Sequence, residues 1–221
     1  MLRLYYLPLC PFSRKVRVAL REKNLAAELI EVQPWAAGDE FLNMNPAGEV
    51  PVLVDDDLVV CDSQAICEYL EEAYPQTTLL GRSLEQRVET RRLVAWFDSK
   101  FGREVTEPLW REKLVKRWKR AGWPSSDALR RGAEAIRFHL AYIDFLYQQR
   151  KWLAGDELSM ADVVAAAHLS VLDYMDDVPW KSSAGARDWY AKMKSRPSFR
   201  PILMDRVAGI KPPDHYDNPD F

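Results

Sequence analysis

The pattern of apolar residues changes once along this chain, near residue 80, and this change limits what the chain can fold into. Before it, short strand-like runs alternate with helix-like patterns. The strand-like runs lie at 2–6, 27–32, 52–54 and 58–61, and the helix-like patterns at 13–23 and 63–72. Strands that alternate with helices predict a small α/β unit. After the change, apolar residues recur at three-to-four spacing almost to the end, which predicts an all-α unit.

We therefore expect three parts: an α/β unit over 1–78, a helical unit over 79–208, and an extended tail over 209–221. Prolines interrupt the tail, so it cannot form a helix. A chain of 221 residues is long enough to bury a sizeable core without disulfides.

Charge and cysteine content argue against several classes of protein. The chain has 31 Lys and Arg against 33 Asp and Glu, and this net charge of −2 disfavours non-specific nucleic-acid binding. Three cysteines, Cys10, Cys61 and Cys67, cannot form a closed disulfide set and lack the spacing of a zinc site. No signal-peptide pattern opens the chain, and the longest apolar run, 163–169, is far shorter than a membrane helix. We expect a cytoplasmic protein with no metal and no membrane span.

The first motif with possible chemistry is LCPFSRKVR, which follows a strand and opens a helix. Free N–H groups and the positive end of the helix dipole favour a thiolate there, which lowers the pKa of Cys10. Cys10 is therefore a candidate catalytic residue, with Ser13 as a second candidate. The alternative is that Cys10 is an ordinary small buried residue and that Ser13 or Pro11 caps the helix.

Two further motifs could hold a peptide-like ligand. In NPAGEVPVL, a proline enters a strand, and a cis Val50–Pro51 bond would leave the Val50 backbone free to pair with a peptide. The alternative is a plain turn that leads into a hairpin. In CDSQAI, Ser63 and the N–H groups after it could bind a carboxylate, and Asp62 could meet an amine. The alternative is a simple helix N-cap.

A fourth motif, LSMADV, contains a Ser159-x-x-Asp162 capping box before an apolar helix. We interpret it as structural.

In this order, CPFSRKVR, NPAGEVPVL, DSQAICEYL and LSMADV resemble the glutathione transferase superfamily over essentially the whole chain. The resemblance implies an α/β thioredoxin-like N-terminal domain, an all-α C-terminal domain and a homodimer. It implies glutathione as cosubstrate, with Cys10 activating the glutathione sulfur or forming a mixed disulfide. It also implies that Val50 and cis-Pro51 clamp the cysteinyl backbone, and that Asp62 and Ser63 hold the γ-glutamyl group.

Two departures from that pattern favour a degenerate glutathione pocket. Glu49 stands where many family members have a lysine, and its carboxylate would repel the glycyl carboxylate of glutathione. Trp35 places an indole where a polar or basic loop is expected. That indole is a contact for a substrate or partner, or else a half-buried loop aromatic.

Basic residues crowd the stretch 111–120, interleaved with tryptophans and opposed only by Glu112. We name Lys113, Lys116, Arg117, Lys119 and Arg120 as candidate contacts for an acidic protein partner. The alternative is a solvated helix face. In the tail, Tyr216, Asp220 and Phe221 are further candidates, because exposed aromatic rings are costly and should pack on the body or on a partner.

The tail, the Gln33-Pro34-Trp35 loop and Glu49 together resemble a narrower group of bacterial cell-division proteins in this superfamily, which bind filaments of the tubulin-like protein FtsZ. Our leading hypothesis is a homodimeric binding protein for FtsZ filaments that regulates division. The alternative is an enzyme, a glutathione transferase or glutathione-dependent thiol reductase, with Cys10 at the catalytic position.

Overall fold

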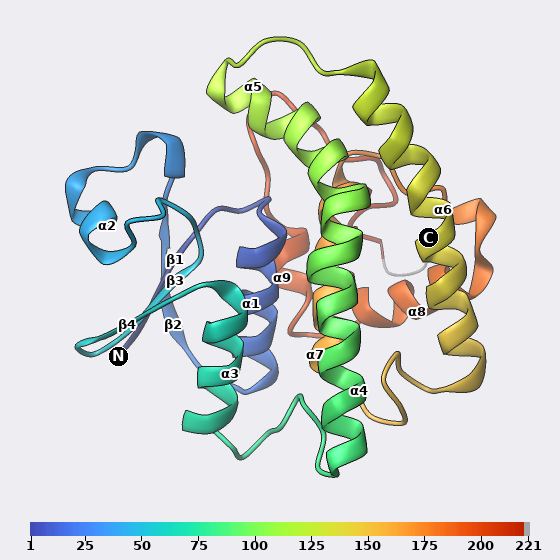
Figure 1. The fold of residues 1–221 in the computed structure, drawn as a ribbon, viewed down its shortest axis with the longest axis horizontal. Helices are drawn as coiled ribbons and strands as arrows, with labels where there is room; N and C mark the ends of the chain where they lie inside the picture. Colours follow the sequence, from blue (N-terminus) through green and yellow to red (C-terminus); the bar gives the residue numbers. More distant parts are fainter. Residues whose placement is uncertain (219–221) are drawn as a thin grey trace.

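The computed structural model describes residues 1–218, and its first part is a four-stranded mixed sheet (Figure 1). The strands are β1 (Leu2–Tyr6), β2 (Ala27–Glu31), β3 (Val52–Asp55) and β4 (Leu58–Cys61), in the order β2-β1-β3-β4. The first two strands are parallel, so a helix must connect them, whereas β3 and β4 form an antiparallel hairpin.

Helices cover both faces of this sheet. The elements are α1 (Pro11–Glu22) and α3 (Ser63–Ala73) on one face, and η1 (Pro34–Ala36) and α2 (Asp39–Met44) toward the other (Figure 1). The first helix begins at Pro11, where a proline lacks only a donor that would have no helical partner. On the opposite face, Phe41 of α2 packs against Val52 and Val54 in a small separate core.

The second part of the chain is helical. Its elements are α4 (Leu84–Ala95), η2 (Trp96–Val115), α5 (Lys116–Lys119), α6 (Ser126–Gln149), α7 (Met160–Tyr174), η3 (Trp180–Ser182), α8 (Ala184–Lys194) and α9 (Arg200–Leu203). The segment η2 has π-type hydrogen bonding, contains Pro108, and joins α4 to α5 in one continuous rod (Figure 1). Every residue of α7 is buried, so this helix is the centre of the helical core.

The predicted fold class, an α/β thioredoxin-like N-terminal domain followed by an all-α C-terminal domain, is confirmed. The predicted capping box is also present, since Ser159 and Asp162 bond each other's backbone N–H groups at the start of α7. The carboxylate of Asp162 does more than the pattern predicts. It also accepts hydrogen bonds from Leu153 N–H at 2.9 Å and Trp189 Nε1 at 3.0 Å, which ties the loop before α7 and helix α8 to it.

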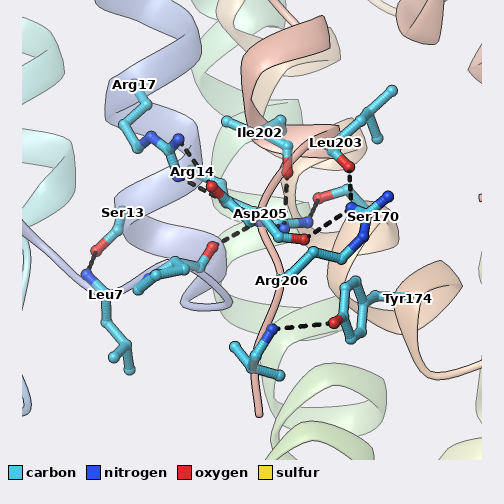
Figure 2. Close-up of polar contacts among 12 residues, drawn as sticks. Leu7, Ser13, Arg14, Arg17, Ser170, Tyr174, Ile202, Leu203, Asp205 and Arg206 are labelled. Carbon is cyan, nitrogen blue, oxygen red and sulfur yellow. Dashed lines mark hydrogen bonds and ion pairs between the residues drawn. The ribbon is translucent and has the colours of Figure 1, made fainter. Parts of the chain in front are cut away.

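A buried guanidinium joins the two parts (Figure 2). Arg14 of α1 is fully buried, and all of its partners outside its own segment lie in the helical part or the tail. It donates hydrogen bonds to Pro8 O, Ser170 Oγ, Tyr216 Oη, Ile202 O and Asp205 Oδ2, at 2.8 to 3.2 Å. Because a buried cation is tolerated only when its donors are satisfied, this network fixes α1 against α7, α9 and the tail.

Candidate functional site

A cleft between the sheet and the rod formed by α4 and η2 contains two adjoining pockets, of about 710 and 650 Å³. Both pockets are lined by Phe12, Glu49, Val50, Asp98 and Ser99. The first pocket adds Pro51, Asp62 and Ser63, and the second adds Cys10 and Trp35. The fold therefore places around one cleft all the residues that the resemblance implies for glutathione.

Cys10 is the N-cap residue of α1, but its thiol is not activated as predicted. The side chain is only 3% exposed, and its Sγ lies 3.9 Å from Val50 O. Burial raises the pKa of Cys10, and the hydrogen bonds from Ser13 and Phe12 do not offset that effect. The prediction of a lowered pKa was therefore wrong, because it counted the helix start and not the loss of water.

Ser13, the second catalytic candidate, is also buried. Its hydroxyl accepts a hydrogen bond from Leu7 N–H at 3.2 Å, and Ser13 lines neither pocket of the cleft. In this position Ser13 holds the β1–α1 turn in shape.

The Val50–Pro51 bond is cis, as predicted. Val50 lies at the boundary of the two pockets, and its N–H donates to no other residue in the part of the chain that is described. The preceding loop is held by Asn45, whose Nδ2 donates to Glu49 O at 2.8 Å. A strand-like backbone edge is thus presented to the cleft.

Asp62 acts mainly as an N-cap for α3, the structural alternative. Its Oδ1 accepts from Gln64 N–H at 2.8 Å and from Ala65 N–H at 3.0 Å. These two donors are therefore not free for a ligand carboxylate, contrary to the expectation of an anion site formed by Ser63 and the N–H groups after it. Ser63 itself is buried at the pocket wall.

The first pocket has more acidic than basic side chains, and two of its carboxylates, Glu49 and Asp62, form no ion pair within residues 1–218. Among the described residues that line it, four are carboxylates, Glu49, Asp62, Glu68 and Asp98, and one is a cation, Arg91. Arg91 is already bonded to Glu68 at 2.8 Å. Glutathione carries two carboxylates and one amine, so its anionic ends meet a negative field in this pocket.

Sequence reasoning missed a buried polar chain beneath the cleft. Lys15 is fully buried and its Nζ lies 2.5 Å from Asp98 Oδ2, while Asp98 Oδ1 lies 3.2 Å from His168 Nε2. His168 Nδ1 continues the chain to Thr106 Oγ1 at 2.8 Å. Burial raises the pKa of Asp98, but the hydrogen bond with His168 and the charge of Lys15 outweigh it and hold that pKa below its usual value.

The Gln33-Pro34-Trp35 loop lies against the basic stretch 111–120. The ring of Trp35 stacks on Trp118 of α5, with centroids 5.5 Å apart, and Trp118 meets the edge of Trp110 at 6.5 Å. Three tryptophans that the sequence separates by up to 83 positions thus form one cluster between the N-terminal part and α5.

The basic stretch itself divides into paired and unpaired cations. Lys113 pairs with Asp177, Lys116 with Glu112 at 2.6 Å, and Arg111 with Glu107 at 2.9 Å. In contrast, Arg117, Lys119 and Arg120 are exposed and form no ion pair within residues 1–218. The paired cations therefore fit the alternative of a solvated helix face, whereas the three unpaired cations are available to a partner.

Tyr216 packs on the body of the protein. It is fully buried, its hydroxyl accepts from Arg14 at 2.9 Å, and its ring meets Tyr174 edge-on. A buried ring cannot touch a partner in this arrangement, so its predicted role as a contact needs correction. Two neighbours hold the same segment, since Lys194 donates to His215 O at 2.7 Å and Asp173 Oδ1 lies 2.9 Å from His215 Nε2. Asp220 and Phe221 lie outside the described residues.

No group of three or more His, Cys, Asp or Glu side chains in the described residues is arranged to hold a metal ion. No helix within 1–218 is both long and apolar enough to cross a membrane.

Comparisons with known proteins agree with this geometry. Residues 4–78 match a family model described as the glutathione S-transferase N-terminal domain. FtsZ-localized protein A of Caulobacter vibrioides is 51% identical over 99% of this chain and 97% of its own length. A solved structure of a glutathione S-transferase from Rhodospirillum rubrum is 55% identical and superposes over all of both chains with a TM-score of 0.98. The structure of FzlA from C. crescentus is 50% identical, covers 100% of this chain and 99% of that one, and has a TM-score of 0.96.

Proposed function

This chain belongs to the glutathione S-transferase family, and on that premise we propose that it uses the fold as a binding protein rather than as an enzyme. It is a homodimer that recognises FtsZ filaments in the cytoplasm and regulates bacterial cell division. The observation that carries the proposal is the 51% identity to FtsZ-localized protein A, which extends over nearly the full length of both chains.

The state of the cleft supports a role other than glutathione chemistry. Burial raises the pKa of Cys10, so its sulfur is a protonated thiol near neutral pH, whereas a nucleophile needs the thiolate. Glu49 is exposed at the first pocket, where its carboxylate would repel the glycyl carboxylate of glutathione. Both features weaken the site for the family's usual ligand.

The surface around α5 supports partner binding. Trp35 is fixed there by Trp118, and the three cations Arg117, Lys119 and Arg120 are free to meet acidic groups. The tail, including Asp220 and Phe221, remains a proposed contact, with Tyr216 anchoring it to the body.

Exposed apolar side chains support the homodimer. Leu84 and Val88 on α4 are 74% and 59% exposed, and Leu58 and Val59 on β4 are 49% and 39% exposed. Contiguous exposed apolar patches mark surfaces that associate, and Leu84 and Val88, four positions apart, lie on one face of α4. Sedimentation equilibrium should give about twice the chain mass of 25.6 kDa, and Val88→Glu should shift it toward the monomer.

Co-sedimentation with polymerised FtsZ tests the proposed function. The protein should pellet with filaments formed in GTP and stay in the supernatant with unpolymerised FtsZ. Failure to pellet over a range of salt from 50 to 300 mM, in buffers where filaments are intact, would refute the proposal.

A glutathione-dependent enzyme is the second candidate, favoured by the 55% identity to the Rhodospirillum rubrum glutathione S-transferase. In that function Cys10 would contact the sulfur of glutathione, while Val50, Pro51, Asp62 and Ser63 would hold the tripeptide. Calorimetric titration separates the two candidates. No heat with millimolar glutathione is expected for the binding protein. Clear binding, together with conjugating activity that Cys10→Ala abolishes, would support the enzyme.

A further inference from the structure

The loop between α5 and α6 carries the most exposed tryptophan among the residues that the structure describes. Trp123 is 92% exposed and lies in a loop, whereas exposed apolar residues such as Leu84 and Phe145 lie on helices. A tryptophan left in water loses the largest burial gain of any side chain, and tryptophan is also the residue most enriched at the centres of protein interfaces.

Hydrogen bonds hold the backbone of the loop at and after this tryptophan. Lys116 Nζ donates to Trp123 O at 3.4 Å, and Ser125 N–H donates to Glu112 Oε2 at 2.6 Å. Before it, Arg120 ends α5 in the left-handed conformation with φ +51°, and Ala121 N–H donates to Lys116 O at 2.9 Å. A pinned loop loses less conformational freedom on binding than a mobile one.

The three unpaired cations lie directly before this loop. Arg117, Lys119 and Arg120 precede Trp123 by three to six positions, on α5 and at its end. Their surroundings are fixed, because Trp118 between them stacks on Trp35 of the N-terminal part. In Figure 1, the loop and α5 form one projecting end of the molecule.

The start of the C-terminal tail lies beside the same surface. A Cβ placed on Gly209 would be 2.5 Å from Arg117 Nη2, so this guanidinium rests against the tail backbone. Thus the Trp35 loop, the basic stretch and the tail, which the sequence suggested separately, meet around α5.

We propose that Arg117, Lys119, Arg120 and Trp123 form the docking surface for an acidic, partly apolar face of the filament protein, with Trp123 as its central anchor. This inference rests on the proposed function and adds where and how the partner is recognised. Unpaired cations attract and orient an acidic surface, and the indole buries apolar area at the centre of the contact.

The chemistry favours a protein partner over other anionic surfaces. Residues next to Trp123 are Gly122, Pro124 and Ser125, so no continuous apolar face is present to enter a lipid bilayer. Nucleic-acid binding would require several aromatic platforms or a reading element along a basic groove, and the charge of the whole chain is −2.

Two variants and two matched controls test this surface in the co-sedimentation assay. Trp123→Ala should weaken the affinity for polymerised FtsZ at least about 10-fold, as expected for a central anchor. Lys119→Glu should weaken it about 3- to 10-fold, with a larger effect at 50 mM than at 300 mM salt. Phe145→Ala and Lys151→Glu serve as controls. Phe145 is 54% exposed near the end of α6, and Lys151 follows that helix. At a rise of about 1.5 Å per residue, the length of α6 places both controls about 30 Å or more from the loop.

The outcomes are distinct. If the wild-type protein does not pellet with filaments, the proposed function fails and this surface has no partner. If the wild type pellets but Trp123→Ala and Lys119→Glu bind within about twofold of it, the docking surface is wrong while the function stands. Equal losses in the two controls would also overturn it. So would binding to vesicles of 30% phosphatidylglycerol that depends on Trp123, if filament binding does not depend on Trp123.

Discussion

Replacing Tyr216 with phenylalanine removes one oxygen from the buried network around Arg14 and leaves the ring in place. The lost bond joins a charged donor to a phenol at 2.9 Å in a site without water exposure, and such bonds contribute about 1.5–3 kcal/mol to the free energy of unfolding. The same Nη1 also donates to Ser170 Oγ at 2.8 Å, so the guanidinium keeps a partner. We therefore expect the lower half of the range, a loss of about 1.5–2 kcal/mol.

Urea unfolding measures this loss. With an m-value of about 3 kcal/mol per molar, the midpoint should fall by about 0.5–0.7 M with no change in slope. Tyr69→Phe is the matched control, because Tyr74 donates to the same Asp55 oxygen and keeps it paired. The control should cost less than about 1 kcal/mol. Equal midpoints for Tyr216→Phe and the wild type would refute the reasoning that the tail is energetically part of the core.

Three further results are expected. Alkylation of Cys10 by iodoacetamide, followed by mass spectrometry, should be slower at pH 7.5 than that of a free cysteine, because burial raises the pKa of Cys10. The reaction should accelerate only at higher pH, and rapid labelling at pH 7.5 would contradict this. Asp162→Ala should lower the free energy of unfolding by more than about 4 kcal/mol, since it leaves buried donors such as Trp189 Nε1 unpaired, and a melting temperature near that of the wild type would refute it. The hydrogen bond with Asp173 raises the pKa of His215 above its unfolded value near 6.5. Its stabilising contribution is therefore complete below pH 6.5 and disappears as pH rises through the raised value. Melting curves from pH 5.5 to 8.5 should show this slope in the wild type and a smaller slope in His215→Gln.

The fold could be predicted from the sequence because its signals are local. Alternation of short apolar runs marks the sheet, three-to-four spacing marks the helices, and the Ser159–Asp162 box marks the start of α7. The short helix α2 was missed, since its six residues, Asp39–Met44, are too few to show a period.

The site was less predictable because its determinants are distant in the sequence. Arg14 and Lys15 look like ordinary basic residues at the start of a helix, yet both are fully buried against acceptors 83 to 202 positions away. Likewise, the position of Cys10 at a helix start is visible in the sequence, but the burial that raises its pKa depends on the whole cleft. Pairing and desolvation of this kind follow from tertiary packing, which no local pattern encodes.

The bond between Arg14 and Tyr216 has a consequence for how the protein is made. Its two ends are separated by 202 residues, so at a synthesis rate of about 5–20 residues per second the first helix waits about 10–40 s for its last partner. By the end of that time the sheet and most of the helices have left the ribosome, but Arg14 still lacks Tyr216 as an acceptor. The N-terminal part therefore cannot reach its final packing as an independent unit, and completion of the fold depends on the segment around Tyr216, far along the chain.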